Sequence, residues 1–180
     1  MSRVLVIVDI QRDYFPDGAH PLVGADEAAE RAAELLAHQR ELGLPVIHVR
    51  HESREAGASM LVPGTAGGEI DGRLAPRDGE HVVTKTHPNS FLDTPLRALL
   101  DEVAASELLV VGMMSSMCVD ATVRAASDFG YRVTVAADAC AAPDLDFDGV
   151  RVDGARVHAA FMAALGSAYA RVVPSRELIG

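Results

Sequence analysis

Three residues that could together perform acyl transfer stand in separate parts of the chain, each at or just beyond the end of a short apolar run. They are Asp9, Lys85 and Cys118. A cysteine that attacks a carbonyl carbon needs a base to accept its proton and a cation to stabilise the thiolate. A carboxylate and an ammonium group supply these two roles. The three residue types therefore predict thiol-dependent hydrolysis, on the condition that the fold brings them together.

The stretch ELLVVGMMSSMCVDATVRAA (residues 107–126) predicts a strand, a tight turn and a helix. Its β-branched apolar run is broken by Gly112, and apolar residues then recur at helical spacing. Ser115 or Ser116 can cap this helix, which places Cys118 in its first turn. Free backbone N–H groups and the positive end of the helix dipole favour a thiolate at such a position.

The rest of the chain alternates short strands with helices or loops. We expect six strands, at residues 4–8, 46–49, 82–84, 108–111, 133–136 and 171–173. We expect helices at 26–42, after Thr94 and Pro95, from 119 onward and after Asp153, with loops at 50–79 and 144–148. Asp26 is a possible cap of the first helix, and the last helix is expected to bury Val157, Ala160, Phe161 and Ala164.

This alternation predicts an α/β fold: a three-layer α/β/α sandwich with a six-stranded, mostly parallel, Rossmann-like sheet, formed by a single domain over residues 1–180. In such sheets ligands bind beyond the carboxyl ends of the strands, near the point where the strand order reverses. Asp9 and Lys85 end two of the predicted strands, and Cys118 follows a third. We therefore expect the three side chains to meet at one edge of the sheet.

Composition excludes several classes of function. The 180 residues are 49% hydrophobic, which is enough for one full core, and the formal net charge is -10. An acidic chain is poorly suited to nucleic acid or to anionic membranes, so neither is expected as a partner. The two cysteines do not form a disulfide framework, and no apolar run is long enough for a signal peptide or a membrane span. A cytoplasmic location is expected.

Three blocks of the sequence resemble the signature blocks of the isochorismatase-like cysteine hydrolases, in the same order and spacing. The blocks are DIQRDYF at 9–15, VVTKTHPNSF at 82–91 and VVGMMSSMCVDATVRAASDFGYRVTVAADAC at 110–140. That family includes nicotinamidases, N-carbamoylsarcosine amidase and streptothricin hydrolase. The similarity extends over nearly the whole chain.

The resemblance implies a role for each member of the triad. Asp9 is expected to be the general base and then the general acid, Lys85 to lower the pKa of the thiol, and Cys118 to be the nucleophile. A cis peptide bond is expected between Met113 and Met114, with an oxyanion hole made by the N–H groups of Met114 and Cys118. The resemblance also implies a homo-oligomer, a dimer or a tetramer.

The predicted substrate is a small amide, lactam or cyclic imide. The segments expected to surround Cys118 supply a mixed polar and apolar lining: Tyr14, Phe15, His51, Asn89, Phe91 and Met117. The loop at 60–62 could close over the ligand. The alternative for the aromatic residues, and for Phe91 above all, is that they pack in the core.

A metal site is the alternative for the histidines. Metal-dependent nicotinamidases carry an Asp-x-His element after the second strand, and this chain has no aspartate at the corresponding place. His48 and His51 could still bind a metal with His81 or His87, but metal sites need converging ligands and a supporting shell. We expect no metal and no cofactor.

Two other functions compete with amide hydrolysis. Relatives that hydrolyse isochorismate lack the cysteine, so Cys118 argues for an amidase over an isochorismatase-type hydrolase. A non-catalytic α/β binding module is the other alternative, although no glycine-rich nucleotide-binding pattern follows a strand. Cys140 follows the fifth predicted strand without a helical turn and is expected to be structural.

Overall fold

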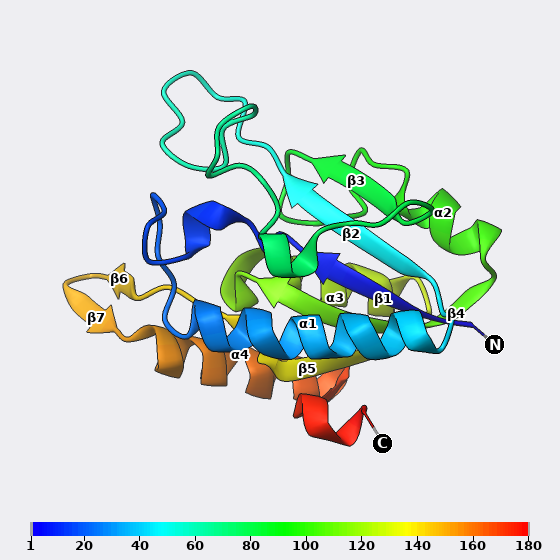
Figure 1. Ribbon diagram of the computed structural model, residues 1–180. Helices are drawn as coiled ribbons and strands as arrows, with labels where there is room; N and C mark the ends of the chain where they lie inside the picture. The colour runs from blue at the N-terminus through cyan, green and yellow to red at the C-terminus, as the bar shows by residue number, and fades with distance from the viewer. Residues whose placement is uncertain (1, 180) are drawn as a thin grey trace.

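The computed structural model describes residues 2–179, and its centre is a six-stranded sheet in the order β3-β2-β1-β4-β5-β8 (Figure 1). Every neighbouring pair in this sheet is parallel, which confirms the predicted fold class. The strands are β1 (Ser2–Val8), β2 (Val46–His51), β3 (His81–Lys85), β4 (Ala105–Met113), β5 (Arg132–Ala141) and β8 (Arg171–Val173). Helices cover both faces of the sheet, so the central strands read as continuous apolar runs.

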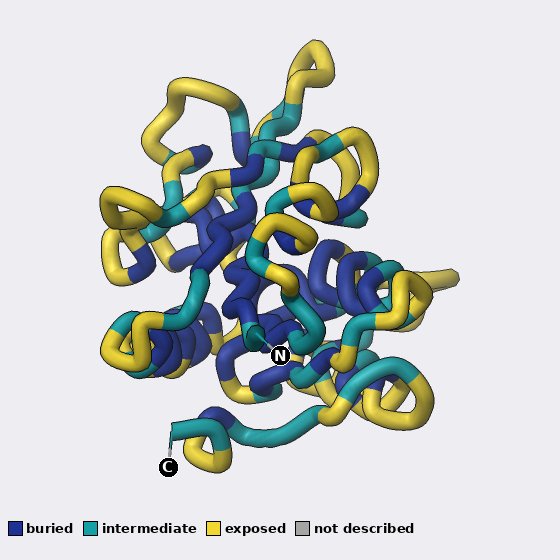
Figure 2. Tube along the Cα trace, turned by 90° about the vertical axis from the view of Figure 1, so that its right-hand side faces the viewer, coloured by how far each residue is buried: buried dark blue, intermediate teal, exposed yellow. Residues whose placement is uncertain are grey.

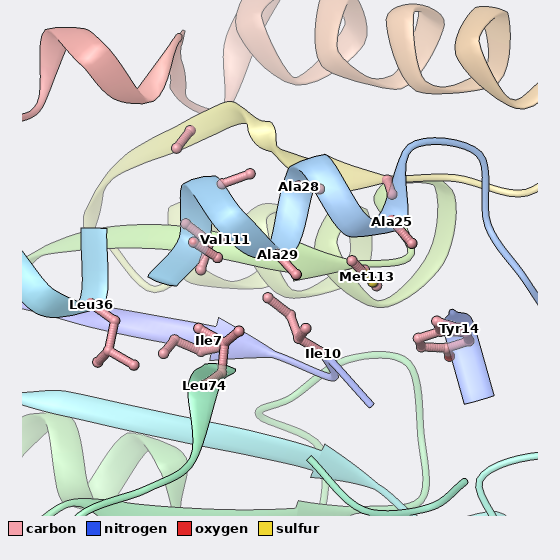
Figure 3. Packing of buried hydrophobic residues seen from close by; sticks show 14 of the residues in the cluster. Ile7, Ile10, Tyr14, Ala25, Ala28, Ala29, Leu36, Leu74, Val111 and Met113 are labelled. Atoms are coloured by element: carbon pink, nitrogen blue, oxygen red, sulfur yellow. The ribbon is translucent and has the colours of Figure 1, made fainter. Parts of the chain in front are cut away.

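The helices divide unequally between the two faces. On one face, α1 (Ala25–Glu41) packs its alanines and leucines against β1 and β4, as Figure 3 shows for Ala29 and Leu36 near Ile7. The opposite face is covered by α2 (Leu96–Glu102), α3 (Asp120–Asp128) and α4 (Gly154–Ala168). Small residues on α1 let the helix lie close to the sheet.

The strand order reverses between β1 and β4, and Asp9 and Cys118 follow these two strands. From β1 the chain adds β2 and β3 on one side, and from β4 it adds β5 and β8 on the other. Val8 is in register with Val49 of β2 and with Gly112 of β4, so these strands end together. Ligands bind at such a switch point in open α/β sheets.

Gly112 allows β1 and β4 to approach at this edge. Its φ is +141°, a conformation that side chains with a Cβ rarely adopt. A Cβ built on Gly112 would lie 2.0 Å from the carbonyl oxygen of Val8. Only glycine therefore fits between the end of β1 and the turn that carries Cys118.

The structure corrects several expected details of the helices. The N-cap position of α1 is Gly24, in a left-handed conformation, and not Asp26. Asp153 does cap α4, since its carboxylate accepts the N–H of Arg156. The predicted inner face of α4 is partly wrong. Ala160 and Ala164 are exposed and Phe161 is half-buried, whereas Gly154, Val157, Met162 and Leu165 are the buried residues.

Residues 144–148 do not form a simple loop as predicted. They begin a two-stranded antiparallel hairpin made of β6 (Leu145–Phe147) and β7 (Val150–Val152), which projects from the body of the protein (Figure 1). Cys140 lies inside β5 and not after it. The hairpin was missed and β5 was predicted too short for the same reason: whether a residue joins a strand depends on the strand that pairs with it, and local sequence patterns do not reveal that partner.

Burial separates a continuous interior from exposed connections (Figure 2). The loop segment between β2 and β3 is largely exposed, but it anchors Leu61 and Leu74 in the core. Within residues 2–179, no helix combines the length and the apolar character needed to cross a bilayer.

Candidate active site

Asp9 is the first residue after β1 and has a strained backbone. Its φ is +50°, in the left-handed region that residues with a Cβ seldom occupy. Hydrogen bonds hold this conformation: Asp9 N–H donates to Val49 O at 3.0 Å, and Asp9 O accepts from Gln11 N–H at 2.9 Å. The residue is fully buried. Outliers of this kind cluster at functional sites because the surrounding structure must enforce them.

Lys85 ends β3 and places its ammonium group at the centre of the site. Its Nζ lies 2.7 Å from Asp9 Oδ2 and 3.2 Å from Cys118 Sγ. It also lies 3.0 Å from His51 Nδ1 and 3.0 Å from the carbonyl oxygen of His87. The side chains of Lys85 and Asp9 are 0% exposed, so the ion pair is shielded from solvent. The three residues predicted from the sequence therefore lie together.

Cys118 sits in a π-helical turn (Ser115–Val119) between β4 and α3. The carbonyl oxygen of Met114 closes the turn by accepting the N–H groups of Met117 and Val119, at 3.0 and 3.1 Å. The peptide bond between Met113 and Met114 is cis.

The predicted serine cap of this turn is wrong. The N-cap position is Met114, with no side-chain cap. Ser115 Oγ instead lies 2.8 Å from Nδ1 of His158 on α4. Ser116 Oγ is buried without a hydrogen-bond partner among the described residues.

The electrostatics of the site correct the expectation of a resting thiolate. Burial and then the negative charge of Asp9 raise the pKa of Cys118 to about 12, although Lys85 opposes this rise. Burial also raises the pKa of Asp9 against the opposing effect of Lys85. For Lys85, burial alone would lower the pKa, but Asp9 and Cys118 outweigh it and raise the pKa. In the resting site, Cys118 is thus a thiol that lies beside the carboxylate of Asp9 and the ammonium group of Lys85.

This arrangement allows a proton to move within the site without creating a new buried charge. When the thiol proton moves to Asp9, the buried group still carries one negative and one positive charge, because the thiolate replaces the carboxylate as partner of Lys85. The transfer relocates a charge and does not create one in the low-dielectric interior. A base whose own pKa is raised is also better matched to a thiol.

Gln11 is a positioning residue that the sequence analysis did not single out. Its fully buried side chain accepts from His51 N–H at 2.8 Å and donates to His51 O at 2.9 Å and to Gly68 O at 2.8 Å. These bonds join the segment after β1 to the end of β2 and to the following loop. The available signal was its place in the DIQRDYF block, two positions after Asp9.

A pocket of about 830 Å³ opens beside this group. Of the six predicted lining residues, His51 and Met117 border it. The other bordering residues are Glu52, Ser53, Arg54, Glu55, Ala58, Ser59, Met60, Thr86, His87 and Pro88. Met60 belongs to the loop that was predicted to close over the ligand. The wall combines two thioethers with charged and hydrogen-bonding groups.

The other four predicted lining residues have different surroundings. Phe91 packs in the hydrophobic core against Phe129, with ring centroids 5.1 Å apart, as the core alternative described. Phe15 borders a separate pocket and lies under the guanidinium of Arg73.

Asn89 and Tyr14 are the remaining two. Asn89 Oδ1 accepts the N–H of Phe91 and so holds the loop after β3. Tyr14 is fully buried, and its hydroxyl has no hydrogen-bond partner among residues 2–179. Burial and then the charges of Asp9 and Cys118 raise the pKa of Tyr14. Tyr14 belongs to the same buried cluster as Ala25 and Met113, which are labelled with it in Figure 3.

The structure separates the histidines that were considered as metal ligands. His48 Nε2 lies 2.8 Å from Glu80, and His48 is fully buried. In the described part of the chain, the side chains close enough to share a metal are Asp9, His51 and Cys118, with ligand atoms within 4.8 Å of one another. The Lys85 ammonium contacts all three and occupies the position of a shared cation.

Comparisons with known proteins identify the family and the fold. Residues 3–168 match the family model described as the isochorismatase domain. The isochorismatase family protein YddQ of Bacillus subtilis is 45% identical over 172 residues, covering 96% of both chains. Maleamate amidohydrolase of Pseudomonas putida is 30% identical over 146 residues, covering 73% of this chain and 68% of its own. A crystal structure described as an isochorismatase hydrolase from Oleispira antarctica has a TM-score of 0.95 and 49% identity, covering 99% of this chain and 96% of its own.

Proposed function

The chain belongs to the isochorismatase family, and from this premise we propose that it is a cysteine-dependent amidohydrolase. The substrate is a small amide, lactam or cyclic imide, and the reaction cleaves its C–N bond through a thioester on Cys118. One observation carries the proposal: the buried ammonium of Lys85 lies within 3.2 Å of both Asp9 Oδ2 and Cys118 Sγ. The amidohydrolase activity in the name of the Pseudomonas relative supports the same reaction class.

In the acylation step, Asp9 accepts the proton of Cys118 and Sγ attacks the substrate carbonyl carbon. The N–H groups of Met114 and Cys118 donate to the developing oxyanion, an interaction worth about 3 to 4 kcal/mol per donor in acyl transfer. The C–N bond then breaks as Asp9 returns the proton to the departing nitrogen. Lys85 stays charged throughout and accompanies the negative charge as it moves from Asp9 to Sγ.

In the deacylation step, Asp9 accepts a proton from water, and the resulting hydroxide attacks the thioester carbon. The C–S bond breaks, the thiol recovers its proton and the carboxylic acid leaves. This sequence uses one carboxylate alternately as base and acid. The proposed steps require no metal. Turnover is therefore expected both with and without a chelator, and every assay should include both conditions.

The first experiment tests the wild-type enzyme on maleamate, nicotinamide and succinimide, with product analysis by liquid chromatography. Hydroxylamine added during turnover should divert the acyl group to a hydroxamate, and rapid acid quench should reveal an acyl adduct on Cys118 by mass spectrometry. Cys118→Ala should abolish both signals. Cys140→Ser is the matched control and should stay active, because Cys140 is buried within β5 and its thiol donates to Ala136 O at 3.5 Å.

Two outcomes would refute the proposal. One is a folded Cys118→Ala variant that hydrolyses an amide at the wild-type rate. The other is cleavage of a vinyl ether without any thiol adduct, which is the behaviour of an isochorismatase-type enzyme. Loss of turnover to a chelator, restored by added zinc, would instead assign Asp9, His51 and Cys118 as metal ligands.

A further inference from the structure

The contact with Lys85 fixes which ring nitrogen of His51 carries the proton. Lys85 Nζ lies 3.0 Å from His51 Nδ1. An ammonium group has only donors, so Nδ1 must be the acceptor in this contact. A neutral imidazole carries its single proton on the other nitrogen, which makes Nε2–H a donor.

The surroundings keep the ring neutral. Burial, and after it the charges of Lys85 and His87, lower the pKa of His51 to about 4. With Nδ1 engaged and Nε2 protonated, the ring has no free lone pair. His51 therefore cannot serve as a second general base in deacylation.

The position of His51 is rigid as well. Both its N–H and its carbonyl oxygen are bound by the side chain of Gln11, at 2.8 and 2.9 Å. Its register partner in the sheet is Lys85 itself. The backbone and the ring are thus fixed relative to the residues that perform the reaction.

His51 lies in the wall of the pocket beside the triad. His51 borders the 830 Å³ pocket together with Met60 and Met117. A ring nitrogen of His51 lies within 4.8 Å of both the Cys118 sulfur and an Asp9 carboxylate oxygen. Within the described residues, Nε2 has no hydrogen-bond partner. The ring therefore lies next to the reacting groups, and a preorganised donor left open on a ring that borders the pocket is suited to a second acceptor on the same small substrate.

We infer that His51 selects the substrate: its Nε2–H binds a second acceptor, a carbonyl or carboxylate oxygen, carried by the same small molecule as the scissile amide. The inference rests on the proposed amidohydrolase function and names its substrate class, amides with a second oxygen acceptor. Monofunctional amides leave the donor unpaired in the pocket and bind weakly, because a site built to hydrogen-bond a group discriminates against analogues that lack it.

Two variants test the roles of the two ring nitrogens, Nδ1 and Nε2, separately. In His51→Asn the amide oxygen can replace Nδ1 as acceptor for Lys85, but the side chain is too short to place a donor at Nε2. In His51→Gln the amide nitrogen can reach the position of Nε2, while the contact with Lys85 is lost. The Gln variant should therefore keep substrate selectivity and the Asn variant should lose it.

Binding is measured by calorimetry in the Cys118→Ala background, so that no turnover occurs. The probes are two matched pairs: succinimide with 2-pyrrolidinone, and succinamate with butanamide. With His51 present, the first member of at least one pair should bind about tenfold more tightly than the second, which corresponds to about 1.4 kcal/mol. His51→Asn should reduce this ratio to near one, and His51→Gln should retain it.

Equal binding of both members of each pair, no binding of any probe, or an unchanged ratio in His51→Asn would overturn the inference. Nitrogen NMR of the imidazole provides an independent check, since it should show a proton on Nε2 and none on Nδ1 at neutral pH. These readouts are distinct from turnover. Wild-type hydrolysis that depends on Cys118 but shows no His51 selectivity would retain the proposed function and reject only this role.

Discussion

At the scale of single residues, Asp9 and Lys85 act on the thiol in opposite directions. The negative charge of Asp9 contributes to the raised pKa of Cys118, while Lys85 lowers that pKa. The two substitutions should therefore move the thiol pKa in opposite directions. Turnover should fall in both, because the reaction needs the base and the cation together.

Asp9→Asn is expected to separate thiol ionisation from catalysis. Asparagine tolerates the left-handed φ of +50° and has nearly the same shape, so the fold should persist. Loss of the negative charge lowers the pKa of Cys118, so iodoacetamide should alkylate it at lower pH than in the wild type. Turnover should nevertheless fall by about 10²–10⁴-fold, the usual contribution of a general acid or base. A variant that keeps wild-type turnover would exclude Asp9 as the proton carrier.

Lys85→Met is expected to shift the thiol in the other direction. Removal of the ammonium leaves burial and Asp9 to raise the pKa of Cys118 unopposed. The pH at which iodoacetamide reaches half of its maximal rate should rise above the wild-type value. The measurement belongs in a Cys140→Ser background, so that one thiol reports. An unchanged alkylation profile would mean that Lys85 does not influence the nucleophile.

At the scale of the elements, Gly112 sets the spacing between β1 and β4. Gly112→Ala combines an unfavourable φ with a Cβ 2.0 Å from Val8 O, so we expect a loss on the order of 3 kcal/mol or more in the free energy of unfolding. Gly166→Ala in α4 is the control, because its Cβ would meet only Val172 at 3.5 Å. That change should stabilise the protein by about 0.5 to 1 kcal/mol. Chemical denaturation measures both, and equal values would contradict the role of Gly112.

A second prediction at this scale concerns Glu80, the residue before β3. Its carboxylate contacts Arg40 of α1 and His48 of β2. Burial alone would raise the pKa of Glu80, but hydrogen bonds from Arg40, from the N–H of Arg77 and from His48 outweigh it and hold the pKa at about 2. The folded pKa lies below the ordinary value of 4.5, so the stabilisation is present above about pH 4.5 and is lost as the pH falls toward 2. Its size is on the order of 3 kcal/mol.

Glu80→Gln should therefore destabilise the protein at neutral pH and flatten the dependence of stability on pH in this acidic window. Glu34→Gln is the control. Glu34 pairs with Arg31 on the surface, with side chains 50% and 45% exposed, and such pairs contribute little. Urea denaturation at a series of pH values distinguishes the two. A wild-type acid profile in Glu80→Gln would show that the network has no net effect.

At the scale of the whole molecule, the outer face of α4 carries the prediction of a homo-oligomer. Residues 159–168 contain no charged side chain, and the exposed residues Ala160 and Ala164 lie on this face. The neighbouring hairpin ends in Phe147, which is 83% exposed. Because each copy carries a formal charge of -10, two copies should meet with the least local repulsion at a surface without charges such as this one.

Analytical ultracentrifugation should therefore show a mass at least twice that of one chain. Ala160→Glu should shift the equilibrium toward single chains, because it places a carboxylate on the uncharged face. Ala37→Glu on the exposed side of α1 is the matched control and should leave the mass unchanged. A monomer at all concentrations would contradict the predicted assembly.

The amino-acid sequence alone determined the order of the main-sheet strands and of α1 to α4 along the chain, and the positions of Asp9, Lys85 and Cys118 at or just beyond strand ends, but not the hairpin of β6 and β7. These features depend on local periodicity, which any stretch of a few residues carries within itself. The parallel sheet followed from the same pattern, since right-handed crossovers restrict how alternating elements can pack. The family could likewise be identified from three short blocks.

The tertiary structure alone decided which side chains touch and how charged they are. The raised pKa of Cys118 follows from burial, and the fixed ring of His51 follows from a contact with Lys85, 34 residues away in the sequence. The core position of Phe91 and the exposed face of α4 also depend on what packs against them. Desolvation and hydrogen bonding are properties of the assembled surroundings, so no local pattern of residues contains them.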